Sequence, residues 1–122
     1  MLPAAKRQDP KQKNKSKQFA GRNHLARAEK ALSQACERYL PEESDVCRAA
    51  RYSLLGGGKR IRAVLVLAVC DMLHGNAEAA EQFAAAVEML HCYSLIHDDL
   101  PCMDNDDMRR GKPSCHIAFG EA

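Results

Sequence analysis

Apolar residues recur at steps of three and four along most of this 122-residue chain, a spacing that predicts amphipathic helices. The first such run covers residues 24–40 and ends before Pro41, which cannot continue a helix. A second run starts after Ser44 or Asp45, either of which can cap a helix, and reaches Leu55. The first half of the chain therefore predicts two short helices joined by a tight connection.

Two further apolar segments follow a run of three glycines. Residues 61–74 are apolar nearly all round, which predicts a buried helix. Residues 77–99 form the longest helical run, and Pro101 is expected to stop it. Phe83 and Leu90 share one stripe of that run, and its many alanines allow other helices to pack closely. The pattern predicts an all-α fold.

Composition supports this prediction and separates a tail from one domain. Aromatic residues make up 5% of the chain, and Trp is absent, which favours helix over sheet. Residues 1–23 hold seven Lys or Arg against one acid and have no apolar period, so we expect a disordered basic tail. A solvated tail is a simpler interpretation than the two alternatives, a transit peptide or a nucleic-acid-binding arm. Residues 24–122 then form the folded part.

Other sequence features favour a cytoplasmic protein without a membrane span. The N-terminus carries no apolar segment typical of a secretory signal. The longest apolar run, residues 63–70, is too short to cross a bilayer. Six cysteines are widely spread without a C-x-x-C pair, so we expect reduced and mostly buried thiols.

Five of the sixteen acidic residues fall between Asp98 and Asp107, and Arg109, Arg110 and Lys112 follow at once. Such a run is often a solvated loop. Two of these carboxylates, however, lie in the predicted last turn of a helix, where the dipole is already negative. A bound cation would offset this cost, and Mg²⁺ prefers oxygen ligands shared with substrate phosphates. The neighbouring arginines can donate to phosphate oxygens, so the stretch predicts a Mg²⁺–diphosphate site.

A second cluster of cations lies at residues 56–62, Gly-Gly-Gly-Lys-Arg-Ile-Arg. It is not a Walker A loop, because Ser53 and Arg60 replace required residues. Free N–H groups at the start of the next helix would nevertheless favour an anion. A flexible turn with solvated charges is the alternative. On the long helix, His91 lies about two turns, ~10 Å, from Asp98 on the same face as Glu88.

The two anion-binding stretches, at this spacing on a helical scaffold, resemble the trans-prenyl diphosphate synthases, most closely the bacterial farnesyl and geranylgeranyl diphosphate synthases. The resemblance covers roughly residues 25–122. Its most specific part is the string Y-S-L-I-H-D-D-L-P-C-M-D-N-D-D-M-R-R-G-K-P at residues 93–113. It implies the N-terminal part of the isoprenoid synthase helical bundle.

The resemblance also implies Mg²⁺-dependent, head-to-tail joining of isopentenyl diphosphate to an allylic diphosphate. Asp98, Asp99 and Asp104 match the first aspartate-rich motif, which holds Mg²⁺, and Arg109 matches the arginine that contacts the allylic diphosphate. The positions that match the isopentenyl diphosphate pocket are Gly58, Lys59, Arg62, His91 and Arg110. Tyr93, five residues before Asp98, matches an aromatic that shortens the product, which favours farnesyl over geranylgeranyl diphosphate.

This chain also departs from the family pattern. Family members are more than twice as long and carry a second aspartate-rich motif, so we expect a truncated bundle with a large exposed apolar surface. The complete enzyme would be a homodimer. Two other functions stay open: a non-catalytic subunit of a full-length synthase, and a diphosphate-ionising cyclase or hydrolase. The cation cluster at residues 56–62 argues against a cyclase, which binds a single diphosphate.

Overall fold

The computed structural model describes residues 10–121, with side chains from Asn23 onward. The helices are α1 (Pro10–Tyr39), α2 (Asp45–Leu55), α3 (Ile61–Met72), α4 (Ala77–Asp99) and α5 (Cys115–Phe119). Two short strands, β1 (Met108–Arg109) and β2 (Lys112–Pro113), form an antiparallel hairpin between α4 and α5. The described part is therefore mainly helical, as predicted.

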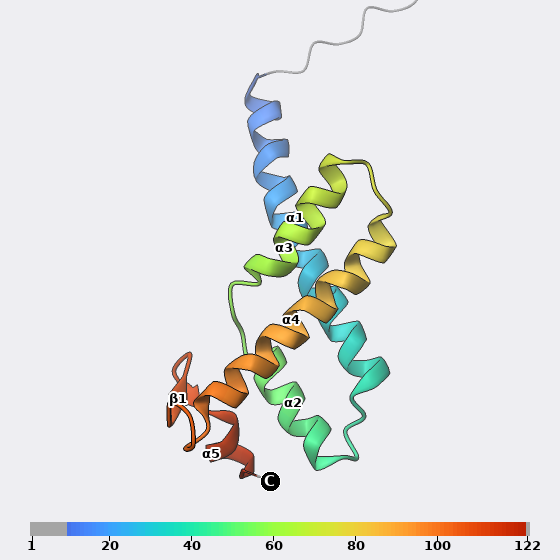
Figure 1. Cartoon of the computed structure of the whole chain (residues 1–122). Coiled ribbons are helices and arrows are strands. Elements are labelled where there is room, and N and C mark those ends of the chain that lie inside the picture. Colours follow the sequence, from blue (N-terminus) through green and yellow to red (C-terminus); the bar gives the residue numbers. More distant parts are fainter. Residues whose placement is uncertain (1–9, 122) are drawn as a thin grey trace, which may run out of the picture.

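Helix α4 is the centre of the arrangement. It packs against α1, α3, α2 and α5, and its C-terminal end carries the hairpin (Figure 1). Asn76 caps its N-terminus by accepting a hydrogen bond from the N–H of Ala79 at 3.1 Å. Its last residue is Asp99, two positions before Pro101, which confirms the predicted stop. The chain thus brings the acidic stretch to one end of the bundle.

The core consists of two clusters around α4. One joins α1, α2 and α4 through Leu32, Cys36, Leu54, Ala85 and Cys92. The other joins α1, α3 and α4 through small side chains and Leu67. Alanines 80 and 84 on α4 lie against Ala63 and Ala28, so the backbones approach closely. The predicted packing role of the α4 alanines holds for this inner face.

The outer faces of α3 and α4 leave large apolar side chains exposed. On α3 these are Ile61, Leu65, Val69 and Met72, and on α4 they are Phe83, Leu90 and Tyr93. The prediction of a helix buried on all sides at residues 61–74 was wrong: α3 buries the face with Ala63 and Leu67 and exposes the opposite one. The expected exposed apolar surface is confirmed.

Helix α1 begins at Pro10, well before the predicted start at residue 24. Residues 10–23 were expected to be a disordered tail, whereas the structure includes them in a helix. Between Pro10 and Gly21 the segment contains no helix breaker, and its Lys, Gln and Ala residues have high helix propensity even without an apolar face. The rest of the predicted tail, residues 1–9, lies outside the described residues.

All six cysteines belong to the described part, and each is a free thiol. Cys36 and Cys92 are buried, whereas Cys102 is exposed, so the expectation of mostly buried thiols holds in part. Across residues 10–121, no helix is both long enough and apolar enough to cross a membrane.

Candidate functional site

The acidic stretch folds back on the C-terminal end of α4. The N–H of Asp104 donates to the carbonyl of Asp98 at 2.9 Å, and the N–H of Asp106 donates to the carbonyl of Asp99 at 3.1 Å. These bonds satisfy carbonyls that the helix end would otherwise leave unpaired. They also place the backbones of Asp98 and Asp104 side by side, although six positions separate them in sequence.

The two adjacent aspartates at the end of α4 have different surroundings. Asp99 is 2% exposed, and both of its carboxylate oxygens accept from Arg109, Oδ2 from Nε at 2.6 Å and Oδ1 from Nη2 at 2.6 Å. Hydrogen bonding to Asp99 raises the pKa of Arg109 above its usual value, against the effect of desolvation. The Asp98 side chain is 49% exposed, with its Oδ1 atom 3.9 Å from Nδ1 of His97.

The three predicted Mg²⁺ ligands therefore differ: Asp99 is paired with Arg109, whereas Asp98 and Asp104 are accessible. Among residues with described side chains, no three His, Cys, Asp or Glu groups converge in a way that would hold a metal ion. Asp99 is already occupied by Arg109, whereas Asp98 and Asp104 offer accessible carboxylates on adjoining backbone. Mg²⁺ commonly takes one or two carboxylates and completes its shell with water and substrate phosphates. The donor chemistry of Asp98 and Asp104 therefore fits Mg²⁺.

The three cationic side chains at the start of α3 point in different directions. Gly57 and Gly58 have φ angles of 111° and 127°, and Arg60 has a φ of 55°, so the backbone turns sharply. The Arg60 side chain points inward, is 4% exposed, and donates to Glu29 at 2.8 Å and to the carbonyl of Leu54 at 2.5 Å. Lys59 and Arg62 stay exposed. The structure thus separates one structural arginine from two cations that can meet a ligand.

Arg110 joins the hairpin to this glycine segment. Its Nη1 donates to the carbonyl of Gly57 at 2.5 Å, and its guanidinium lies close to Gly58. A Cβ atom at Gly58 would come within 3.1 Å of the guanidinium carbon, so a side chain there would push Arg110 away. The predicted contribution of Gly58 therefore has a steric basis as well as a conformational one.

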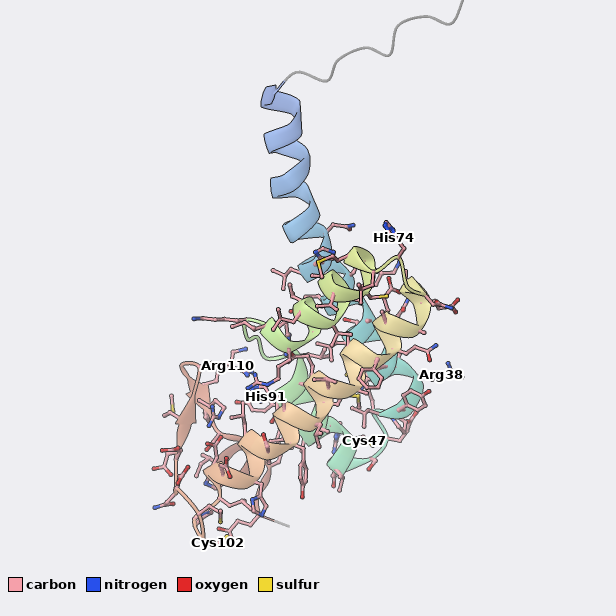
Figure 2. The ribbon with its side chains drawn as sticks, turned by 45° about the horizontal axis from the view of Figure 1, so that its top comes forward. Arg38, Cys47, His74, His91, Cys102 and Arg110 are labelled. Atoms are coloured by element: carbon pink, nitrogen blue, oxygen red, sulfur yellow. The ribbon has the colours of Figure 1, made fainter. Side chains whose placement is uncertain are left out.

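A cavity of about 290 Å³ opens between the start of α3, α4 and the hairpin. It brings together four of the five residues predicted to bind isopentenyl diphosphate, and Gly58 lies at its edge against Arg110. Figure 2 shows the His91 and Arg110 side chains close to each other on the hairpin side of α4. The lining residues are Lys59, Arg60, Ile61, Arg62, Glu88, His91, Leu95, Arg109 and Arg110.

Two charged residues of this cavity, Glu88 and Arg60, were not assigned a role from the sequence. Glu88 is 3% exposed and accepts the backbone N–H of Ala63 at 3.1 Å, and Arg60 holds Glu29 and Leu54 as described. The alignment of Glu88 with His91 on one helix face was a usable signal for the first. The inward direction of Arg60 had no local signal, because it depends on a partner 31 positions away.

Tyr93 lies outside this cavity. Its side chain is 64% exposed on the outer face of α4, and its ring centroid is 6.3 Å from that of His97. It continues the exposed apolar stripe that contains Leu90. The structure thus places Tyr93 on the open apolar side of α4, away from the cations.

The cavity also affects the ionisation of His91. Burial lowers its pKa below the usual value, and the positive charge of Arg62 lowers it further, while Glu88 opposes the shift. Because the unfolded chain then binds the proton more tightly than the folded chain, His91 destabilises the fold as the pH falls below about 6.5.

We expect His91→Gln to reduce the acid sensitivity of folding. The free energy of unfolding, measured by urea denaturation at pH 7.5 and pH 5.5, should fall less in His91→Gln than in the wild type. His74→Gln is the control, because His74 is exposed. An identical loss in wild type and His91→Gln would contradict the assigned environment of His91.

The chain matches a known protein family over about two thirds of its length. The polyprenyl synthetase family model matches residues 43–122. Over 92 residues the chain is 56% identical to a chloroplastic geranylgeranyl pyrophosphate synthase of Capsicum annuum, covering 75% of this chain and 24% of that protein. A heterodimeric geranylgeranyl pyrophosphate synthase large subunit of Arabidopsis thaliana is equally similar, at 56% identity and the same coverage of both chains.

Solved structures agree with the sequence comparison. The geranyltransferase of Legionella pneumophila superposes with a TM-score of 0.78 at 45% identity, over 88% of this chain and 37% of that one. A geranyltranstransferase of Thermotoga maritima gives a TM-score of 0.77 at 40% identity, over 83% of this chain and 37% of that one. The chain thus spans 24% of the length of these sequence relatives and 37% of the two solved chains. It belongs to the polyprenyl synthetase family of prenyl diphosphate synthases, of which it represents an N-terminal portion.

Proposed function

We propose that this chain supplies the diphosphate-binding portion of a prenyltransferase that joins isopentenyl diphosphate head to tail to an allylic diphosphate. One observation carries the proposal: two consecutive arginines of the hairpin both line the cavity, yet each bonds to a different segment that we propose as an anion site. Arg109 turns to Asp99 beside the acidic loop, and Arg110 turns to Gly57 beside Lys59, Arg62 and His91. An enzyme that condenses two diphosphates needs two such sites, whereas a cyclase needs one.

In this proposal the acidic loop and Arg109 receive the allylic diphosphate. The predicted Mg²⁺ ligands are Asp98, Asp99 and Asp104; the contacts favour Asp98 and Asp104 as direct ligands and Asp99 as the partner of Arg109. When bound, Mg²⁺ supplies positive charge to a leaving diphosphate. Two hydrogen bonds from Nε and Nη2 to Asp99 fix the orientation of the Arg109 guanidinium. Its remaining Nη1 group can then donate to the same diphosphate.

The second site receives isopentenyl diphosphate through Gly58, Lys59, Arg62, His91 and Arg110. Its cations fix the diphosphate group, so that the alkene of isopentenyl diphosphate is held toward the allylic carbon. The allylic C–O bond breaks with its electron pair on the diphosphate, the alkene attacks the resulting cation, and a proton leaves the product. Preorganised cations at the developing anion are the main electrostatic contribution of these residues.

Product length is proposed from Tyr93. Its bulk on the outer face of α4, five positions before Asp98, favours the shorter farnesyl product. The relatives named geranylgeranyl pyrophosphate synthases, at 56% identity, favour the longer product instead. Tyr93→Ala separates the two, because a chain limited by Tyr93 should release longer products after the substitution.

Assembly and location are proposals of the same kind. The whole protein would act as a homodimer in the cytoplasm. The Arabidopsis relative is named a large subunit of a heterodimeric synthase, which supports assembly with a different subunit; a non-catalytic subunit is the second candidate. Names of other relatives place them in chloroplasts or mitochondria.

Turnover of radiolabelled isopentenyl diphosphate with geranyl diphosphate and Mg²⁺ tests the proposal. The chain is assayed alone and together with a full-length relative. A labelled product from the chain alone supports catalysis by these residues. A changed rate or product of the relative, together with a stable complex by size-exclusion chromatography, supports the subunit role. Failure of the chain to bind either diphosphate in calorimetry would reject both.

Arg62→Ala is expected to weaken binding of isopentenyl diphosphate about tenfold or more, because it removes charge-assisted hydrogen bonds to phosphate. Isothermal titration calorimetry on this chain measures the effect. The control is Arg38→Ala, an exposed arginine on the opposite side of α4 from His91 (Figure 2). If Arg62→Ala instead weakened geranyl diphosphate binding with Mg²⁺, the two sites would have been assigned in reverse.

A further inference from the structure

We infer that Glu88 is a positioning residue whose buried carboxylate caps α3 and thereby holds Lys59 and Arg62 in the diphosphate cavity. The inference rests on the proposed function of that cavity. It concerns a residue that does not itself contact the ligand and that carries the wrong charge to attract one.

Helix α3 begins without a cap of its own. The residue at its N-cap position, Arg60, has a left-handed backbone, and among the described residues its side chain makes no capping bond. That side chain is committed to Glu29 and Leu54. The first intrahelical bond runs from the N–H of Val64 to the carbonyl of Arg60 at 2.9 Å. The N–H groups of the first turn therefore need partners from outside the helix.

Glu88 supplies such a partner from the neighbouring helix. Its Oε1 atom accepts the N–H of Ala63, the third residue of α3, at 3.1 Å, and this bond is buried. Burying a carboxylate is costly unless hydrogen bonds and positive charge compensate. The Ala63 N–H provides the hydrogen bond, and the positive end of the α3 dipole and the cations of the cavity provide the positive charge. Glu88 thus bonds the start of α3 to α4, three positions before His91.

The position of this bond explains its effect on the cavity. Arg62 directly precedes Ala63 in α3 and Lys59 lies four positions before Ala63, and both cations line the cavity with His91 and Arg110. Fixing Ala63 against α4 sets the distance between the cations of the α3 segment and those of α4 and the hairpin. A glycine segment with positive φ angles at Gly57 and Gly58 imposes little restraint of its own.

Charge and position predict opposite results when Glu88 is changed. A negative group in the cavity repels a diphosphate, so on charge alone both Glu88→Gln and Glu88→Ala would bind it more tightly. If Glu88 acts as a cap, Glu88→Gln keeps an acceptor oxygen at nearly the same place, whereas Glu88→Ala leaves the N–H of Ala63 unpaired.

The test uses inorganic pyrophosphate and the full chain. We expect Glu88→Ala to bind pyrophosphate about tenfold more weakly than wild type in calorimetry, and Glu88→Gln to bind within about threefold of wild type. Glu37→Ala, an exposed glutamate on α1, is the control. Wild-type or tighter affinity in Glu88→Ala overturns the proposal, and so does an affinity of Glu88→Gln as weak as that of Glu88→Ala.

Amide hydrogen exchange at Ala63 gives a second readout that needs no ligand. The amide should be protected in wild type and Glu88→Gln and lose its protection in Glu88→Ala, while Leu67 in the middle of α3 stays protected in all three. If Glu88→Ala fails to fold, the wild type still decides: an Ala63 amide that exchanges as fast as an exposed one overturns the proposal. Protection at Ala63 without any pyrophosphate binding would instead reject the proposed function and leave the cap in place.

Discussion

Replacing Asp98 by alanine is expected to lower the rate of prenyl transfer by at least about a hundredfold. Its carboxylate is proposed to bind Mg²⁺, and the positive charge of that ion stabilises the leaving diphosphate mainly in the transition state. The assay uses a chimera in which residues 24–122 replace the aligned segment of the Legionella geranyltransferase, which is 45% identical. Stability should not fall with activity. Asp98 is half exposed at the negative end of the α4 dipole, so its removal should leave the unfolding free energy unchanged or slightly raised.

Asp107→Ala is the matched control for that experiment. Asp107 lies in the same acidic loop and is exposed, but its backbone carbonyl, which accepts from Ser114 at 2.8 Å, is unaffected by the substitution. Its rate should stay within about threefold of the parent chimera. A nearly normal rate in Asp98→Ala would remove Asp98 from the metal site, and an equal loss in both variants would point to the charge of the whole loop.

The helices could be read from the sequence because their causes are local. Apolar spacing, the stop at Pro101 and the start at Asp45 depend on neighbouring residues, and the structure has α2, α3 and α4 near the expected bounds. The start of α1 was missed because residues 10–23 are helical by propensity rather than by an apolar face. The exposure of Leu65 and Leu90 could be expected only from the greater length of related proteins, because leucine is a residue type that normally lies in a core.

The sequence named residues of the candidate site, four of which line one cavity, but it did not indicate the contacts between them. Asp98 and Asp99 are identical side chains about 100° apart on one helix, and nothing local tells which one faces the hairpin. Likewise Arg60 and Arg62 look alike in sequence, and a bond to Glu29 decides that Arg60 turns inward. Each distinction depends on a partner brought near by the tertiary fold.

Arg109→Ala is expected to lower the free energy of unfolding by about 2 to 3 kcal/mol. The substitution leaves Asp99, 2% exposed, without either of its hydrogen bonds, and an unpaired buried charge typically costs about 3 to 5 kcal/mol. The lower figure reflects the exposure of Arg109, whose side chain is 34% accessible to solvent. Urea denaturation at pH 7 measures the change.

Arg110→Ala is the control, because the neighbouring arginine is exposed and bonds a carbonyl rather than a buried carboxylate. Its cost should stay below about 1.5 kcal/mol. The double variant Asp99→Ala with Arg109→Ala should recover part of the loss, since it removes the stranded charge as well as its partner. Equal, small losses in Arg109→Ala and Arg110→Ala would mean that the pair does not anchor the hairpin. The expected difference would identify Arg109 as the cation that offsets the second aspartate at the negative end of α4, which leaves Asp98 and Asp104 for a ligand.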